Sequence, residues 1–473
     1  MDGVATAPLH PVAASALVLG LLVLATVMIR LAQSRRRLTE AGARQAMLVA
    51  ACAVAISLPW LFASVLAVGA MALVAAAVVV GAHRVPVALP GQRQGQDVAL
   101  GGIALPLAVV VLFALTSASP VLYTIPFLLL GLAEPAAALT GARHGLAPYA
   151  TVDGTKSREG SVAFAFVAFL CVHVPLLVFT PVGRAEALWI AAIVAVLGTI
   201  VEAVSWGGLV HLFVPVGTYV VLVRLLTLEA AGLAGHFVVL MGLLALAAVL
   251  RRETTVGGAG VFGAALVGYL AWSLGGTAWL LPPVMVYVLY ARIWPASREA
   301  DGLPHDPSRR PHTALNVFSV SAVSVAWLLI SGASGAELLF PYALGWACSL
   351  VFLGVERMLN ARPGWSLGQL AWRASWRATV VAVGPVLLVV WLRVAADALA
   401  GVPTGGPVAP THPVVLTAVY LVVGLGVTAV AAAVFATWRR RTSGAIGVAE
   451  ERLFRAGVAA PLTVFGLLAA LVP

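Results

Sequence analysis

The sequence predicts an all-α polytopic integral membrane protein with about 14–16 transmembrane helices, and three observations carry that prediction. Of the 473 residues, 62% are hydrophobic and 10% are charged, whereas a soluble chain carries about 25% charged residues. Apolar runs of roughly 18–22 residues recur along the chain, and that length crosses a hydrocarbon core of about 30 Å. Arginines concentrate in every second loop between these runs, as expected for a multi-pass protein.

The apolar runs give the order of the predicted spans. No strand-like alternation accompanies the runs, and helices satisfy their own backbone hydrogen bonds in lipid. The separation of the second and third spans, near Pro59-Trp60, has the weakest sequence signal. The predicted spans are residues 11–31, 46–63, 64–82, 99–118, 120–139, 161–180, 187–204, 208–227, 229–250, 256–275, 277–292, 314–332, 336–355, 379–399, 413–437 and 456–472.

The cation distribution predicts an orientation. With the N-terminus outside, the arginine-rich loops fall on the cytoplasmic side of a bacterial-type inner (plasma) membrane. These loops are residues 33–45, 83–98, 140–160, 251–255, 293–313, 357–378 and 438–455. The net charge of +10 is explained by this topology, so we expect the bilayer and a lipid as partners and no nucleic acid.

The loop at 140–160 contains the single lysine of the chain, Lys156. Arg143, His144 and Arg158 bring further potential cations into the same loop, and glycines permit tight turns. Glycines, hydroxyl groups and a lysine ahead of a helix N-terminus suit a phosphate cradle. The alternative is an ordinary basic inside loop.

Three ionisable residues lie within or beside the predicted spans around this loop. Glu134 and Glu202 lie near the cytoplasmic ends of their spans, and His211 begins the next span. Such residues are costly in a membrane, so they line a site or pair with one another. Two carboxylates facing cations could bind Mg²⁺ or act as acid and base; the alternative is a structural Glu–Arg pair.

These residues carry a resemblance to the membrane phytol kinase and dolichol kinase family over roughly residues 35–227. The first motif is Glu134, then Gly141-Ala142-Arg143-His144-Gly145, then Lys156-Ser157-Arg158-Glu159-Gly160-Ser161. The second begins at Glu202 and continues Gly208-Leu209-Val210-His211-Leu212, with Pro215 following. The resemblance implies a nucleotide-dependent prenol kinase that uses CTP or ATP and Mg²⁺.

The resemblance also implies roles for individual residues. By this resemblance, Glu134, Glu202 and Lys156 would be the catalytic residues, and Glu134 and Glu202 would also bind the metal. The substrate and its phosphates would contact Arg143, Lys156, Ser157, Glu159, Gly160, Ser161 and His211. An isoprenoid lipid alcohol would be the substrate, with its tail between helices and its head at the cytoplasmic site.

The sequence departs from the family pattern at several positions. Glu134 replaces an Asp, and Val210-His211 replaces an Asp-Asn pair. A prenyl-diphosphate transferase, lyase or terpene cyclase on the same scaffold therefore remains an alternative. A lipid transporter or flippase and a non-catalytic membrane scaffold are further alternatives, although the ionisable residues cluster at one membrane face rather than along a midplane path.

The second half of the chain carries weaker signals. We divide the chain into a prenol-kinase-like domain, residues 1–228, and a second membrane domain, residues 229–473. Residues 251–292 resemble the opening of the phytyl-phosphate kinase family, but the acidic motif that follows there has only Glu356 as a candidate here. A Gly-rich packing face is the alternative explanation, so the second domain is either a degenerate partner or a scaffold.

Overall fold

The computed structural model describes residues 10–82, 97–116, 119–152, 154–206, 208–250, 258–293, 314–361, 364–399, 413–442 and 448–467. Over these residues the chain forms sixteen helices and one two-stranded hairpin. Ten of the helices are long and apolar enough to cross a membrane, and five shorter helices are also apolar. The predicted all-α polytopic membrane protein is confirmed.

The chain divides into two compact units, Met1–Met241 and Gly242–Pro473. The boundary lies inside helix α9 (Ala230–Leu250) and not at the predicted position between residues 228 and 229. The first half of α9 packs on unit 1, where the rings of Phe237 and Trp189 lie 5.4 Å apart. Farther along the helix, Ala247 accepts a hydrogen bond from the Tyr287 hydroxyl of unit 2 at 3.3 Å.

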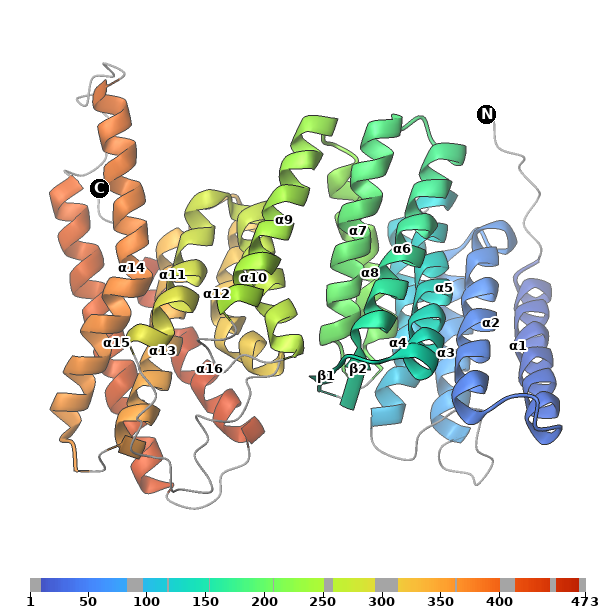
Figure 1. Cartoon of the computed structure of the whole chain (residues 1–473), viewed down its shortest axis with the longest axis horizontal. Helices are drawn as coiled ribbons and strands as arrows, with labels where there is room; N and C mark the ends of the chain where they lie inside the picture. Colours follow the sequence, from blue (N-terminus) through green and yellow to red (C-terminus); the bar gives the residue numbers. More distant parts are fainter. Residues whose placement is uncertain are drawn as a thin grey trace. The chain divides into compact units, whose positions relative to one another are not determined.

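Unit 1 is a helical bundle with one helix at its centre (Figure 1). Its helices are α1 (Pro11–Ser34), α2 (Glu40–Leu61), α3 (Val65–Ala82), α4 (Asp97–Leu115), α5 (Pro120–His144), α6 (Arg158–Phe179), α7 (Arg184–Val204), α8 (Val210–Leu225) and the start of α9. The central helix, α5, packs against α2, α6 and α8, and α7 packs against α6 and α8. These contacts hold α5, α6, α7 and α8 together around the residues of the predicted site.

The break between α2 and α3 occurs close to its predicted position. Pro59 lies inside the last turn of α2, which ends at Leu61 before α3 begins at Val65. The start of α2 is set by Thr39, whose side chain accepts a hydrogen bond from the Gly42 N–H at 3.1 Å. A threonine at this position satisfies one of the free N–H groups of the first helical turn.

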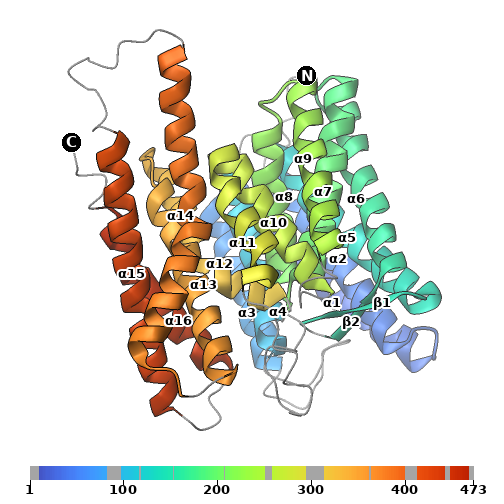
Figure 2. The ribbon, with the colours of Figure 1, turned by 60° about the vertical axis from the view of Figure 1, so that its left-hand side comes forward.

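Unit 2 surrounds a helix that is buried on nearly every side. Its helices are α10 (Ala259–Gly275), α11 (Thr277–Ile293), α12 (Ala314–Ser334), α13 (Leu339–Ala361), α14 (Leu367–Leu399), α15 (Pro413–Arg441) and α16 (Val448–Val464). Helix α13 packs against α11, α12, α14, α15 and α16, and 89% of its most apolar window is buried. Figure 2 shows α14 and α15, which also pack on each other, along one side of this unit.

The last helix corrects the sequence prediction. A span over residues 456–472 was predicted, of which residues 468–472 lie outside the described residues; α16 begins earlier than predicted, at Val448, and over its described length it is not among the apolar helices. Its first turns carry Arg455, which pairs with Glu451 of the same helix and with Glu356 of α13. Because these charges are satisfied by packing inside unit 2, the helix extends over residues that hydropathy assigned to a loop.

The predicted loop 140–160 also differs from expectation. Helix α5 continues to His144, and the chain then forms an antiparallel hairpin of β1 (Pro148–Thr151) and β2 (Gly154–Ser157). Figure 1 shows the hairpin at one end of the unit 1 bundle, beside the ends of α5 and α6. Gly154 begins β2 with a φ of 134°, a conformation that favours glycine.

We therefore expect Gly154→Ala to distort the hairpin. The strain of a non-glycine residue in such a conformation is about 1–3 kcal/mol. The predicted result is easier proteolytic cleavage between α5 and α6, with little change in the melting temperature of the helical bundle. Limited proteolysis with mass spectrometry measures the first effect. Gly217→Ala is the control, since a Cβ there meets open space; equal cleavage of both variants would contradict the prediction.

Candidate functional site

The side chains of Lys156 and Glu202 form a close ion pair between the hairpin and α7. The Lys156 ammonium lies 2.5 Å from Glu202 Oε1 and 2.5 Å from the Glu202 backbone carbonyl. The Glu202 side chain is 9% exposed and the Lys156 side chain 30%. Lys156 thus reaches the last turn of α7, where the carbonyl groups lack helical partners and favour a cation.

A second pair lies between α5 and α8. Glu134 Oε1 is 3.6 Å from His211 Nε2, and Glu134 Oε2 is buried without a hydrogen-bond partner among the described residues. Glu134 is close enough to Glu202 for the two carboxylates to interact electrostatically. The four ionisable residues singled out from the sequence therefore meet, although they come from α5, β2, α7 and α8.

The hairpin orients Lys156 by pairing it with Tyr149. These two residues are opposite each other in the β1–β2 register. The Tyr149 hydroxyl is 2.8 Å from Ser161 Oγ, which anchors β1 to the first turn of α6. Burial raises the pKa of Tyr149 to about 12; the Ser161 hydrogen bond opposes this shift and the nearby Glu202 charge adds to it. At neutral pH the phenol is protonated and serves as a hydrogen-bonding group.

The predicted phosphate-binding residues of the α6 N-terminus are engaged in joining the helix to the hairpin. Ser157 Oγ accepts the Gly160 N–H at 3.1 Å, and the Ser161 hydroxyl donates to the Ser157 carbonyl at 3.2 Å. The Glu159 carboxylate accepts the Ala147 N–H at 3.2 and 3.3 Å. Ser157 is thus the N-cap of α6, and these contacts fix the position from which Lys156 extends.

Arg143 is placed differently from Lys156. It lies in the last turn of α5 with an exposed side chain, and none of its contacts ties it to the Lys156–Glu202 pair. His144, the next residue, is also exposed. Arg143 and His144 lie at the exposed end of α5, whereas Lys156 contacts Glu202.

Small residues allow the close helix crossings that bring the site together. A Cβ on Gly160 would lie 2.9 Å from the Ala137 carbonyl of α5, and a Cβ on Gly131 would lie 2.7 Å from Cys52 Cβ of α2. Neither contact is sterically acceptable, so α6 and α2 approach α5 through glycine. Small residues commonly serve this purpose between membrane helices.

Gly131→Ala should accordingly separate α2 from α5 or strain their contact. Overpacking of this kind costs about 1–3 kcal/mol, so we expect a lower melting temperature in detergent. Cys52→Gly in the same chain removes the opposing Cβ and should restore part of the loss. Failure of Cys52→Gly to improve the Gly131→Ala protein would contradict the steric explanation.

Sequence reasoning missed two residues of the site, Tyr149 and Cys52. The Asp153-Gly154 dipeptide is a hairpin signal, but a two-residue loop at 153–154 would pair Thr151 with Lys156, whereas the structure pairs Tyr149 with Lys156. The Cys52 thiol is buried and close enough to Glu134 to interact electrostatically. No local sequence pattern indicates that Cys52 lies near Glu134, because this contact depends on how α2 crosses α5.

The two carboxylates provide a limited donor set for the predicted Mg²⁺. Within the described ranges, no three His, Cys, Asp or Glu side chains gather as a metal cage. Mg²⁺ is commonly held by one or two carboxylates together with waters and phosphate oxygens. The unpartnered Glu134 Oε2 is the kind of buried atom that a cation would satisfy. Glu134 and Glu202 thus fit a Mg²⁺ shared with a phosphate.

Comparison with known proteins identified no relative of this chain. No family model, no curated protein and no solved structure matches this chain. The functional argument therefore depends on the residues and their geometry.

Proposed function

We propose that unit 1 is a membrane enzyme that acts on the hydroxyl or phosphate head of an isoprenoid lipid alcohol, as a nucleotide-dependent prenol kinase. One observation carries this proposal. Lys156 and Glu202 belong to two separate motifs of the resemblance, 46 residues apart, and their side chains lie 2.5 Å from each other. Glu134 and His211, from the same two motifs, form the adjacent pair.

In the proposed reaction, the lipid hydroxyl attacks the terminal phosphorus of CTP or ATP. The new bond joins the lipid oxygen to this phosphorus, while the bond to the bridging oxygen of the nucleoside diphosphate breaks. Glu134 accepts the hydroxyl proton through Oε1, since Oε2 is the oxygen available to a cation. Lys156 exchanges part of its contact with Glu202 for the phosphate oxygens and neutralises their charge. Positioning and charge neutralisation supply most of the catalysis in phosphoryl transfer.

Mg²⁺, when bound by Glu134 and Glu202, would neutralise further charge on the phosphates. The proposed orientation places this end of the bundle at the cytoplasmic face of a bacterial-type inner membrane, with the N-terminus outside. Nucleotides would then reach the hairpin side of the site, and the prenyl tail would enter between the helices from the bilayer.

His211 supports a second candidate reaction. It stands where the family pattern has Asn, and it lies 3.6 Å from Glu134. A histidine–carboxylate pair can move a proton, which suits a prenyl-diphosphate lyase, cyclase or transferase. Such an enzyme would use the same phosphate contacts and no nucleotide.

One assay distinguishes the two candidates. Purified full-length protein is given labelled CTP or ATP with farnesol or geranylgeraniol, and separately the matching prenyl diphosphates. Prenyl monophosphate formed from a nucleotide supports the kinase, whereas diphosphate release from the prenyl diphosphate supports the second reaction. Lys156→Ala and Glu202→Gln should lower either activity by about 10²–10³-fold. Glu186→Gln, at the opposite end of α7, is the control. Absence of both products would refute the proposal.

A further inference from the structure

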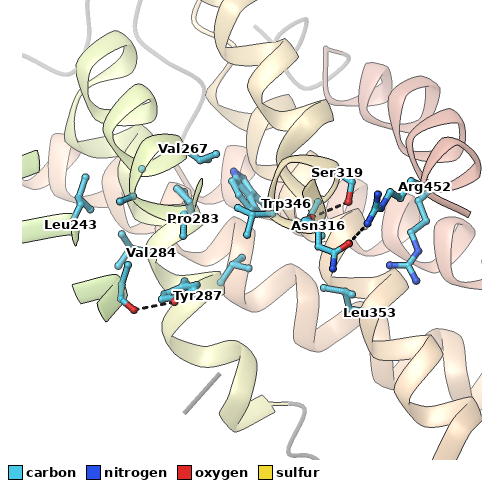
Figure 3. Close-up of a pocket in the computed structure, with 18 of the residues that line it drawn as sticks. Leu243, Val267, Pro283, Val284, Tyr287, Asn316, Ser319, Trp346, Leu353 and Arg452 are labelled. Carbon is cyan, nitrogen blue, oxygen red and sulfur yellow. Dashed lines mark hydrogen bonds between the residues drawn. The ribbon is translucent and has the colours of Figure 1, made fainter. Parts of the chain in front are cut away.

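Unit 2 contains a cavity of about 270 Å³ between α9, α10, α11, α12, α13 and α16. Small-molecule sites in proteins measure roughly 300–1,000 Å³, so this cavity suits a small or slender ligand. Figure 3 shows Leu243, Val267, Pro283 and Val284 gathered in one part of it. This part offers an apolar surface from α9, α10 and α11.

The opposite part of the cavity is polar. Asn316, Ser319 and Arg452 lie together there, and the Arg452 guanidinium donates a hydrogen bond to Asn316 Oδ1 (Figure 3). The other polar side chains of the lining include Glu356, Glu451 and Arg455. The cavity therefore has an apolar part and a polar part.

The two arginines at the polar part have different partners. Arg455 is held by two carboxylates, Glu356 at 2.5 Å and Glu451 on its own helix. Arg452 forms no ion pair with a carboxylate in the described parts of the chain, and its hydrogen-bond partner is a neutral amide. Among the described residues, Glu451 acts on Arg452 electrostatically but forms no ion pair with it, and the remaining N–H donors of the guanidinium can bind a carboxylate through two parallel hydrogen bonds.

A large aromatic side chain, Trp346, lies between the two parts of the cavity (Figure 3). Trp346 lines the cavity and is 5% exposed. The Tyr342 hydroxyl interacts with the Trp346 side chain and donates its own hydrogen bond to the Trp279 carbonyl. Trp346 therefore contributes an aromatic surface to the cavity, between its apolar and polar parts.

We propose that this cavity binds a single-chain amphiphile whose head is a singly charged acid, with a carboxylate on Arg452 and the chain along Leu243, Val267 and Pro283. Glu356 and Glu451 line the same end as Arg452, and their charges oppose the binding of a doubly charged phosphate monoester. A single negative charge completes the environment of Arg452 with the least repulsion. The proposal is independent of the reaction assigned to unit 1.

The test uses full-length protein and a photoreactive dodecanoate that carries a diazirine near the end of its chain. Labelled peptides are mapped by mass spectrometry, and unlabelled dodecanoate, dodecanol and dodecyl phosphate compete for labelling. We expect labels on α9, α10 or α11 at the apolar lining. Dodecanoate should compete at least tenfold better than dodecanol or dodecyl phosphate, which is the scale of a charge-assisted hydrogen bond.

Substitutions test the contribution of the carboxylate head of the ligand separately from that of its apolar chain. Arg452→Gln should remove the tenfold advantage of dodecanoate over dodecanol. Arg393→Gln should not, because Arg393 forms an exposed pair with Glu337 elsewhere in unit 2. Equal competition by all three compounds, stronger competition by dodecyl phosphate, or labelling outside the lining helices would overturn the proposal. The competition order is measured on the unaltered protein, so the test holds even if Arg452→Gln fails to fold.

Discussion

Lys156→Ala is expected to destabilise unit 1 by roughly 3–5 kcal/mol, because the substitution leaves a buried carboxylate without its cation. Glu202 is 7% exposed, and its carboxylate and backbone carbonyl both receive hydrogen bonds from the Lys156 ammonium. Water has little access to replace these bonds. The cost comes mainly from the unpaired charge of Glu202 and less from the attraction that is lost.

A double variant tests this explanation. Lys156→Ala combined with Glu202→Gln removes both charges, so its melting temperature in detergent should lie above that of Lys156→Ala alone. Glu186→Gln, on the same helix, should have a small effect. If the double variant is no more stable than Lys156→Ala, the stabilisation comes from packing of the lysine stem and not from the charge pair.

Arg455→Ala is expected to have a comparable effect on unit 2. Arg455 holds two carboxylates, Glu356 of α13 and Glu451 of α16, and its guanidinium lies 5.1 Å from the centre of the Phe435 ring. The side chains of all three charged residues are less than 20% exposed. Removing the arginine leaves two neighbouring negative charges with no cation between them, at a cost of about 3–5 kcal/mol.

The measurement is the melting temperature of the full-length protein, with Glu356→Gln and Glu451→Gln added to the Arg455→Ala background. Each added substitution should recover stability by removing one unpaired charge. Arg393→Gln provides the comparison for an exposed pair, which contributes about 0–1 kcal/mol. Equal losses for Arg455→Ala and Arg393→Gln would contradict a buried role for this cluster.

The helices could be predicted closely from hydropathy. Fifteen of the sixteen predicted spans lie on apolar helices, and the gap between α2 and α3 falls beside Pro59-Trp60. Apolar runs determine helices in a membrane because lipid offers the backbone no other hydrogen-bond partner. The start of the last helix was not predicted: α16 begins at Val448, in a predicted loop, and its Arg455 pairs with Glu451 and with Glu356, which lies 99 positions away in the sequence.

The identity of the important side chains was also available from the sequence. Glu134, Lys156, Glu202 and His211 stood out because ionisable groups are costly in a membrane and because two motifs contained them. The sequence did not show which of these four residues pair with each other. The sequence suggested cations around a phosphate and carboxylates around a metal, whereas the structure pairs Lys156 with Glu202 and His211 with Glu134.

Composition and the spacing of apolar runs thus determined by themselves that this protein crosses a membrane many times and where its helices lie. These are local properties, set by the transfer of each segment from water to lipid. The tertiary structure alone decided that a hairpin aims Lys156 at the end of α7, that Gly131 brings α2 against α5, and that an amphipathic cavity lies in unit 2. Those features depend on contacts between distant segments, and local hydropathy carries no information about them.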